Sequence, residues 1–390
     1  MAGQTLVPST IEGHINRARD VAPRFWKMAS DLTIRNYLTF YLLRRFGRVT
    51  YGARSHTQVW NAKIRQPQVL PLVDGVPLSF ANQDTDIQFY IGIKSMGVSD
   101  SMPELDYLIM QGAPEQINDR YKEKSVDLST AIDQSLQHSF YKDGNDSANL
   151  YSYVGIKTPL AYLASSGANF SIADKIARPN GTYAGQGCTL ATNGGTWSAA
   201  LATSPNASLA KDWPYGQGSP EYDGTSPIIF NYATSQFQTG ETTWEANGVR
   251  AIAEAATMLM HRAGFMNNSG APLVCVMSSD MFIELKNSFR AQNRHIMPWK
   301  DGDFGFPNQD TIMVDGVLCT SDYTVPAGEA YMWAPQYIEM FNVHENIYKS
   351  YGPEFSMMHR AFLYMATAYG NFKFQPKYLV RFVRRTTAAA

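Results

Sequence analysis

Two alternating segments within residues 58–94 restrict the possible folds of this chain more than any other feature. The letters WNAKIR at 60–65 and IQFYIGI at 87–93 alternate apolar with polar or small side chains, which is the two-residue period of a β-strand. Between them lies a stretch punctuated by proline that contains Asp74-Gly75, a pair typical of tight turns. An isolated hairpin of this length is marginally stable in water, so it needs a surface to lie on. We expect an extended arm that packs on a neighbouring molecule; the alternative is a meander within the chain itself.

Residues 114–142 predict one long amphipathic helix. Pro114 suits the first helical position, where a missing N–H costs nothing, and Gly144 is expected to end the helix as its C′ residue. The apolar stripe is formed by residues spaced four and seven apart: Ile117, Tyr121, Leu128, Ile132, Leu136 and Phe140. About 28 residues at roughly 1.5 Å each give a rod of about 42 Å, which is long enough to span a whole domain.

Residues 179–240 predict a loop-rich insertion. Glycine, serine, threonine, asparagine and alanine dominate this stretch, and it contains four charged side chains: Lys211, Asp212, Glu221 and Asp223. It has no helical period and little strand alternation.

The segments after the insertion alternate between helix and strand signals. Thr242 and Glu245 have the spacing of a capping box at the start of a helix that continues to about residue 263. The letters LVCVM at 273–277 indicate a short buried strand, and Ser278-Ser279 caps the helix that follows.

From residue 312 onward the pattern is β. It includes an Asp315-Gly316 turn and a final strand at 378–383. Because strands and helices follow no repeating βαβ order, the predicted fold class is α+β with mixed sheets.

The charge content indicates a surface that other molecules cover. Only 17% of the residues are charged, against about 25% in an ordinary soluble domain, while aromatic residues make up 13%. Interfaces are enriched in aromatic residues and methionine and depleted in Lys, Glu and Asp. The composition therefore favours a subunit of an assembly over an isolated enzyme.

The net charge of −1 hides a segregation along the chain. Residues 1–50 hold eight basic and three acidic side chains, and the last twenty residues hold five basic side chains and no acid. Residues 100–146 hold ten acids and four bases. Either these are ordinary solvated faces, or the basic ends meet an acidic surface on a neighbouring subunit or on nucleic acid.

The motifs that would indicate catalysis, a cofactor or a metal are missing from the sequence. Gly185-x-Gly187 lacks the third glycine of a dinucleotide loop, the seven histidines have no zinc-ligand spacing, and Cys188, Cys275 and Cys319 are too scattered for a disulfide framework. Recognised nucleic-acid modules are missing as well. The first ten residues do not resemble a secretory signal, and no apolar run reaches 18 residues, so we expect a protein made in a reducing cytoplasm with no membrane span.

The order of these parts resembles the major capsid proteins of tailed bacteriophages, which have the Hong Kong 97-type shell fold. A basic N-terminal segment, a long two-stranded excursion and a long helix are followed by the unit LVCVMSSDMFIEL at 273–285. The segment VDGVLCTSDYTVPAGEAYMW at 314–333 and a terminal strand complete the order. The resemblance covers essentially the whole chain.

The resemblance implies a division of the chain into structural parts. Residues 1–50 would be an N-terminal arm and residues 51–100 an extended loop that reaches over the neighbouring subunit. Residues 101–149 and 311–390 would form a peripheral domain around the long helix, which is called the spine helix in this family. Residues 150–310 would form an axial domain that includes the insertion at 179–240.

The same resemblance implies which residues lie between subunits. In the extended loop these would be Trp60, Lys63, Ile64, Asp74, Gly75, Phe80 and Phe89, and in the N-terminal arm Arg24, Phe25, Trp26, Arg44 and Arg45. Some relatives crosslink a lysine of this loop to an asparagine of a neighbour, but nothing around Lys63 in the sequence marks an activated lysine, so it is given no such role.

As a function, the resemblance implies a shell subunit and no enzymatic activity or cofactor. Hexamers and pentamers of one chain would build an icosahedral virion shell, assembled in the host bacterial cytoplasm, that encloses double-stranded DNA through non-specific contacts. Scaffolding, portal and decoration proteins would be its further partners. Two alternatives are an encapsulin-like compartment shell and a soluble enzyme or glycan-binding protein built around the insertion.

Overall fold

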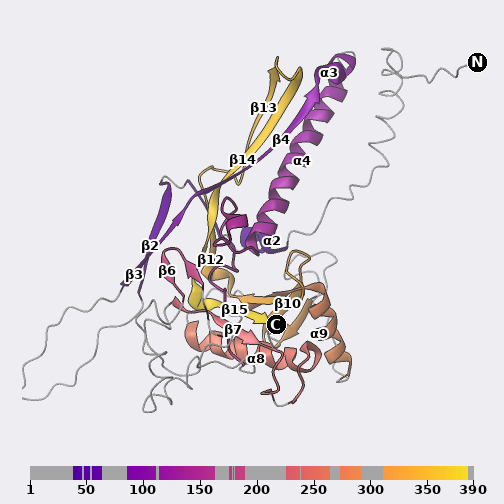
Figure 1. Cartoon of the computed structure of the whole chain (residues 1–390). Coiled ribbons are helices and arrows are strands. Elements are labelled where there is room, and N and C mark those ends of the chain that lie inside the picture. The colour runs from indigo at the N-terminus through magenta and orange to yellow at the C-terminus, as the bar shows by residue number, and fades with distance from the viewer. Residues whose placement is uncertain are drawn as a thin grey trace, which may run out of the picture.

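The computed structural model describes residues 38–45, 48–52, 55–63, 86–110, 114–162, 175–177, 179, 181–188, 225–237, 239–263, 273–291 and 311–384. Their helices and strands form an elongated molecule in which a projecting sheet lies at one end and a helix-covered sheet at the other (Figure 1). In chain order the elements are α2 (Leu38–Arg45), β1 (Val49–Tyr51), β2 (Thr57–Lys63), β3 (Asp86–Gly92), β4 (Lys94–Pro103), α3 (Glu104–Met110), α4 (Pro114–Phe140), β5 (Thr182–Tyr183), β6 (Gln186–Gly187), β7 (Ile228–Asn231), α8 (Trp244–Ala263), β8 (Leu273–Met277), α9 (Ser279–Ala291), β9 (Thr311–Val314), β10 (Val317–Ser321), β11 (Ala330–Trp333), β12 (Ile338–Asn342), β13 (Lys349–Ser356), β14 (Ala361–Phe374) and β15 (Leu379–Val383).

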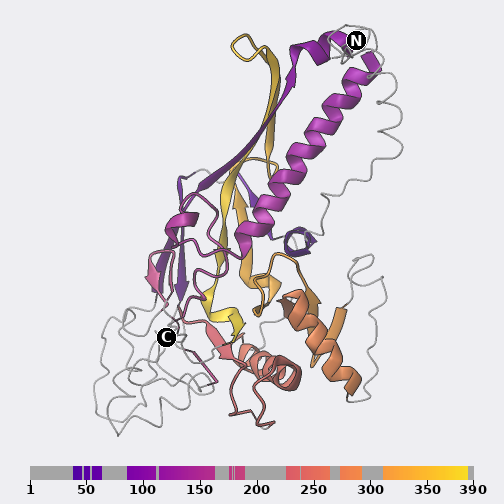
Figure 2. The same cartoon turned by 45° about the vertical axis from the view of Figure 1, so that its right-hand side comes forward.

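The projecting sheet is built around β14. Its first ten residues pair with β4 on one edge and, over most of that length, with β13 on the other, and its last five pair with β12. β1 extends the sheet as a parallel neighbour of β12. In Figure 2, α4 runs along one face of this sheet for most of its length.

The predicted long helix is confirmed as α4, and its apolar stripe is buried where the side chains are described. Leu128, Ile132, Leu136 and Phe140 lie in one core cluster with side chains of β14 and β4. This pairing of a 27-residue helix with a 14-residue strand stiffens the projecting half of the molecule.

The helix ends two residues before the expected end at 142, and Gly144 is not its C′ residue. α4 ends at Phe140, whose carbonyl oxygen accepts a hydrogen bond from the backbone N–H of Ile156 at 2.7 Å. Gly144 does not adopt the left-handed conformation of a C′ residue; instead a Cβ at this position would come within 3.1 Å of Val154. The glycine allows a close approach of two chain segments, which spacing along one helix cannot reveal.

The second sheet has six strands in the order β7-β15-β11-β8-β10-β9. One face, with Cys275, Met332 and Phe382, packs against α8 and α9 in a single apolar cluster. The other face meets the end of α4, where the ring of Trp333 lies 5.6 Å from that of Phe140. The sheet is therefore buried on both sides, and β8, β11 and β15 contain only buried residues.

The expected boundary at residue 310 does not divide the two sheets. β8, before it, and β10, after it, are parallel neighbours with Cys275 opposite Cys319, and β15 pairs with both β7 and β11. Of the strands after residue 310, only β12, β13 and β14 belong to the projecting sheet beside α4, and the sequence patterns did not identify them.

Three short strands lie inside the range expected to be a loop-rich insertion. β5 and β6 form a small hairpin, and β7, a fully buried apolar run, pairs in parallel with β15. Residues 189–224, the larger part of the expected insertion, lie outside the described residues. The cap of the helix after it lies one residue later than predicted: α8 begins at Trp244, and Thr243 rather than Thr242 accepts the N–H of Ala246 at 3.4 Å.

Candidate inter-subunit surfaces

The projecting sheet has one face that no described element covers. Along β14, the buried residues Tyr364 and Ala366 point toward α4, and they alternate with the exposed residues Leu363, Met365 and Tyr369. We call this uncovered side of β4, β14 and β13 the open face. Large apolar side chains in a row on an exposed sheet are unusual for a free monomer and mark an interaction surface.

Small residues border this apolar row. Across β14, Leu363 pairs with Ser101 and Met365 with Ser99, and on the other side Tyr351 of β13 stands opposite Met365. The exposed positions of β4 are occupied mainly by small side chains: Ser95, Gly97, Ser99 and Ser101. Such a border leaves the open face flat enough for an extended segment to lie on it.

A second apolar patch forms the tip of the projecting sheet. The turn between β13 and β14 holds Met357 and Met358, whose side chains are 86% and 92% exposed. On the neighbouring α3, Leu105 and Leu108 are exposed as well, and the N–H of Glu104 donates to the carbonyl oxygen of Arg360. Because methionines adapt their shape to a partner, this tip also suits a protein interface.

The predicted two-stranded excursion is confirmed at its base. β2 and β3 pair antiparallel from Thr57 opposite Gly92 to Lys63 opposite Asp86. Trp60 stacks on Phe89 with ring centroids 5.5 Å apart and planes inclined by 8°. This base does not lie free, since Trp60 also packs against Tyr183 and beneath the ammonium group of Lys373. The described part of the excursion thus has partners within its own chain.

The β5–β6 turn holds the base of the excursion in place. The N–H of Tyr90 donates to the carbonyl oxygen of Ala184 at 3.0 Å, and the side chain of Gln186 donates to the carbonyl oxygen of Gln88 at 2.9 Å. Gly185 lies directly under the ring of Tyr90, where a Cβ would come within 2.1 Å of the ring. These contacts fix the direction in which β2 and β3 leave the body of the molecule.

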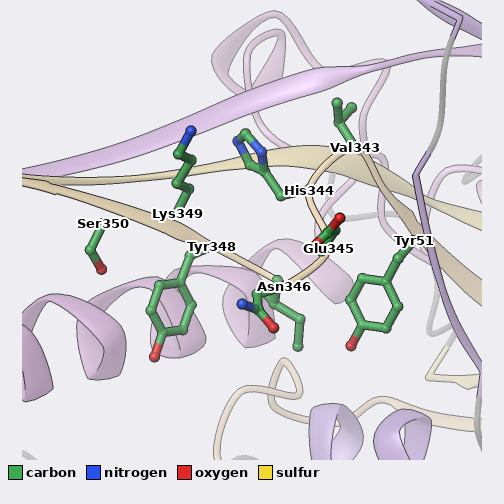
Figure 3. A pocket seen from close by; sticks show the side chains of 9 residues that line it. Tyr51, Val343, His344, Glu345, Asn346, Tyr348, Lys349 and Ser350 are labelled. Carbon is green, nitrogen blue, oxygen red and sulfur yellow. The ribbon is translucent and has the colours of Figure 1, made fainter.

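A groove of about 800 Å³ lies beside the open face. Figure 3 shows the rings of Tyr51 and Tyr348 in this groove, on either side of Asn346. His344, also in its lining, packs edge-on against Tyr369 at 5.4 Å, so the groove adjoins the end of the exposed apolar row. A second, smaller cleft of about 90 Å³ separates Trp60 and Lys63 from Lys377 and Tyr378.

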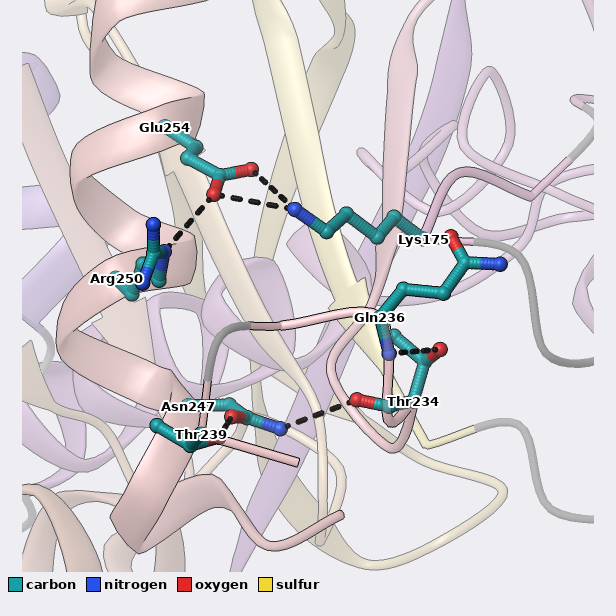
Figure 4. Close-up of polar contacts among 7 residues, drawn as sticks. All are labelled: Lys175, Thr234, Gln236, Thr239, Asn247, Arg250 and Glu254. Atoms are coloured by element: carbon teal, nitrogen blue, oxygen red, sulfur yellow. Dashed lines mark hydrogen bonds and ion pairs between the residues drawn. The ribbon is translucent and has the colours of Figure 1, made fainter. Parts of the chain in front are cut away.

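Polar contacts anchor the segments on both sides of residues 189–224. Lys175 pairs with Glu254 of α8 at 3.3 Å, and Arg250 pairs with the same carboxylate (Figure 4). The amide of Asn247 donates to the carbonyl oxygens of Tyr232 and Glu241, at 2.9 and 2.8 Å. The chain is therefore tied to α8 where it enters and leaves this region.

The structure describes three of the predicted loop residues fully. Trp60 and Phe89 face the body of the molecule and each other, whereas Lys63 is exposed at the end of β2. Arg44 and Arg45 belong to α2, where only their backbone is described. The remaining predicted interface residues lie outside the described residues: Arg24, Phe25, Trp26, Ile64, Asp74, Gly75 and Phe80.

The open face and the tip were not predicted from the sequence. The alternation of Leu363, Met365 and Tyr369 with buried residues was visible, but the buried positions are apolar too, so both faces of β14 look alike in sequence.

The described part of the chain contains no cluster of three or more His, Cys, Asp or Glu side chains able to hold a metal ion. Within the same residues, no helix combines the length and apolar character needed to cross a bilayer.

Comparisons with solved structures show which fold this chain shares. The sequence matches no protein-family model and no curated protein. A chain of the Cyanophage A-1(L) capsid asymmetric unit superposes with a TM-score of 0.57 at 12% identity, covering 92% of this chain and 95% of that one. A chain of the capsid of a native GTA particle gives a TM-score of 0.49 at 11% identity. The likeness to the cyanophage chain extends over nearly the full length of both, so the expected α+β fold of the Hong Kong 97 type is confirmed.

Proposed function

We propose that this chain is the major capsid protein of a tailed bacteriophage, and that its copies assemble as hexamers and pentamers into an icosahedral shell around double-stranded DNA. The observation that carries the proposal is the fold shared with a cyanophage capsid chain over 92% of this chain. A fold alone does not define a function, so the surfaces of the subunit must support the same conclusion.

The exposed apolar surfaces support assembly. The open face and the tip both display large apolar side chains, and Met365 in the open face is 43% exposed. The charge content of 17% also fits a subunit whose surface is covered by its neighbours. An isolated enzyme would gain nothing from exposing such surfaces and would risk aggregation.

Within this proposal, residues 57–92 are the extended loop, whose tip docks on the open face of a neighbouring subunit; residues 94–100, expected in this loop, belong to β4 of the projecting sheet. Ile64, Asp74, Gly75 and Phe80 would then lie at the interface, while Trp60 and Phe89 hold the base of the loop rigid. The β5–β6 turn supports this role, because a loop that must reach a fixed neighbour needs a fixed direction.

The basic N-terminal segment would form a second contact between subunits. Arg24, Phe25, Trp26, Arg44 and Arg45 provide charge and aromatic surface, and residues 100–146 provide an acidic counterpart. In the proposed shell, the half with α4 and the projecting sheet is the peripheral domain and the half with α8 and α9 is the axial domain.

The remaining partners and the location follow from the same proposal. The shell would be a virion capsid assembled in the bacterial cytoplasm, with contacts to a scaffolding protein, a portal and a decoration protein. Its contacts with packaged DNA would be diffuse and electrostatic.

Deleting the tip of the loop tests the proposal directly. A variant lacking residues 67–80 should fold, because the base of the hairpin has its own contacts, and should fail to form shells. Circular dichroism reports the fold, and size-exclusion chromatography with negative-stain microscopy reports assembly. Intact shells from this deletion would refute the docking role of the loop.

A matched pair of substitutions tests the open face. Met365→Asp places a charge at the centre of the face, whereas Met260→Asp places one on α8 at a residue of similar exposure, 46% against 43%. We expect the first variant to reduce the yield of shells at least about tenfold, since an unpaired charge in an interface is costly, and the second to assemble normally. Equal yields would contradict the assignment of this face.

The content of the particles distinguishes a phage head from a compartment shell. Particles purified from infected cells should contain nuclease-protected double-stranded DNA. Particles that contain a protein cargo and no DNA would favour the encapsulin-like alternative.

A further inference from the structure

The groove beside the open face has a fixed shape and an aromatic lining. Its volume is about 800 Å³, and the rings of Tyr51 and Tyr348 lie on either side of Asn346 (Figure 3). The buried side chain of Asn342 donates to the carbonyl oxygen of Asn346 at 2.6 Å, and Ile347 is buried in the core. Because these contacts hold the connection between β12 and β13 in place, a partner meets a groove that is already formed.

The turn between β13 and β14 presents apolar side chains of matching chemistry. Among the large apolar side chains of the described residues, those of Met357 and Met358 are the most exposed, and we call these two the methionine knob. The turn is tied to α3, since the N–H of Glu104 donates to the carbonyl oxygen of Arg360 at 2.9 Å. Methionine is flexible and its thioether packs favourably on aromatic rings, so the methionine knob suits a groove lined by tyrosines.

A single copy cannot bring these two surfaces together. The groove includes Lys349 and Ser350 at the start of β13, whereas the methionine knob follows Ser356 at the end of this strand. The 8 residues of β13, at roughly 3.3 Å each, separate the two surfaces by about 26 Å. β13 is paired with β14, which prevents it from folding back on itself. The methionine knob can therefore reach such a groove only on another molecule.

The charges beside the two surfaces are complementary. Arg360 lies in the same turn as the methionine knob; its side chain is 83% exposed, and its Nε lies 3.4 Å from a carboxylate oxygen of Glu104. In the groove, Glu345 and Lys349 are both exposed. Each surface thus offers charges of both signs, and Arg360 can meet Glu345 without leaving a buried partner.

We propose that the groove of one copy receives the methionine knob of a second copy. In this contact the methionine knob lies between Tyr51 and Tyr348, and Arg360 pairs with Glu345. The inference rests on the proposed function, because it names the partner of a surface between subunits. Since the groove and the knob are different surfaces, the contact is head-to-tail, and its repetition closes into a ring when the rotation between copies allows.

Disulfide trapping tests this contact. Asn346→Cys is prepared in one batch of full-length subunits and Met358→Cys in another, and the batches are mixed, assembled and mildly oxidised. The three native cysteines are buried and should not react. We expect a disulfide-linked dimer of the two variants on a non-reducing gel. A mixture of Asn346→Cys with Met260→Cys, which places the second thiol at an exposed position of α8, is the matched control and should remain unlinked.

The results distinguish this contact from the proposed function. Shells that form without the disulfide would overturn the groove contact and leave the capsid proposal standing, whereas subunits that never associate would contradict both. A disulfide of equal yield in the control would show that the linkage is not specific and would also overturn the contact. If the loop of a neighbouring copy fills the groove instead, Asn346→Cys should link to Phe80→Cys and not to Met358→Cys, which would equally refute the proposal.

A charge exchange tests the same contact without added cysteines. Arg360→Glu and Glu345→Arg should each lower the yield of shells about threefold, because each places two like charges opposite one another. The double variant restores opposite charges and should recover the wild-type yield. A loss that persists in the double variant, or wild-type yields in both single variants, would mean that these two side chains do not meet.

Discussion

Arg381 shows how much a single buried charge depends on residues far away in the sequence. This side chain is 3% exposed in the middle of β15, and its guanidinium donates to Glu329 at 2.6 Å and to the carbonyl oxygen of Leu160 at 2.9 Å. Lys157 also approaches Glu329, at 3.3 Å. Although burial disfavours a charged carboxylate, Arg381 and then Lys157 hold the pKa of Glu329 below its ordinary value. Arg381, Glu329 and Lys157 stabilise one another as a network of charges, whereas a buried Arg381 without its carboxylate partner would lower the stability of the fold.

Glu329→Gln should destabilise the subunit by about 3 kcal/mol, because it leaves Arg381 buried without a counter-charge. Glu254→Gln is the matched control, since Glu254 also pairs with two cations but at a partly exposed site, where the loss should be below about 1 kcal/mol. Urea unfolding of the two variants measures both values. If both variants lose the same unfolding free energy, burial of Arg381 does not make its ion pair with Glu329 more important than an exposed one.

The difference in unfolding free energy between wild type and Glu329→Gln should depend on pH in one direction. Because the pKa of Glu329 is lowered in the folded state, its charge stabilises the subunit above the ordinary value of 4.5, and this contribution is lost as the pH falls through the lowered value. The difference in unfolding free energy between wild type and Glu329→Gln should therefore shrink in acid. A difference that stays constant down to pH 3 would contradict the ion-pair account.

At the scale of elements, two similar hairpin turns have different roles. Ala184-Gly185 joins β5 and β6 with φ angles of 51° and 79°, and Asp315-Gly316 joins β9 and β10 with φ angles of 47° and 81°. Both glycines occupy the left-handed region, but only Gly185 supports a ring of another element, that of Tyr90. One turn closes a hairpin, and the other also contacts the β2–β3 hairpin.

Gly185→Ala and Gly316→Ala separate these roles. Both substitutions should cost about 1–2 kcal/mol of stability, because alanine is strained at such φ values. Only Gly185→Ala should displace Tyr90, increase hydrogen exchange in β3 and lower the yield of shells. If both variants affect β3 and assembly equally, the β5–β6 turn does not direct the loop.

The success of the sequence patterns differs from element to element for physical reasons. α4 and the β2–β3 pair were predictable, because each has one buried and one exposed face that follows the period of its backbone. β13 was not, since almost every residue in it is exposed and no period appears. The boundary between the two sheets was also hidden, because β15 returns from the projecting sheet to pair with β7 and β11.

Interface residues were harder to predict than elements. The resemblance implies that Trp60 and Phe89 contact other subunits; in the structure they stack on each other, and Trp60 also packs against Tyr183. The open face and the tip became visible only once α4 was seen to cover one side of β14. An interface depends on what the fold leaves uncovered, and this is not a property of any local segment.

At the scale of the whole molecule, the separate observations describe a subunit that is incomplete alone. The molecule is elongated, and it exposes the apolar open face and the methionines of the tip. The β5–β6 turn holds the base of the β2–β3 hairpin, and the charge content of the chain is low. The fold is shared with a cyanophage capsid chain along nearly its whole length, which supports the proposal that these surfaces lie between subunits. Each of them would be buried in a closed shell of identical copies.

Imaging of the purified, assembled protein tests this account most directly. Electron microscopy combined with size-exclusion chromatography should find closed shells of uniform diameter with icosahedral symmetry, built from hexamers and pentamers of this chain. A sample that contains only monomers, dimers or other small oligomers under every assembly condition would contradict it.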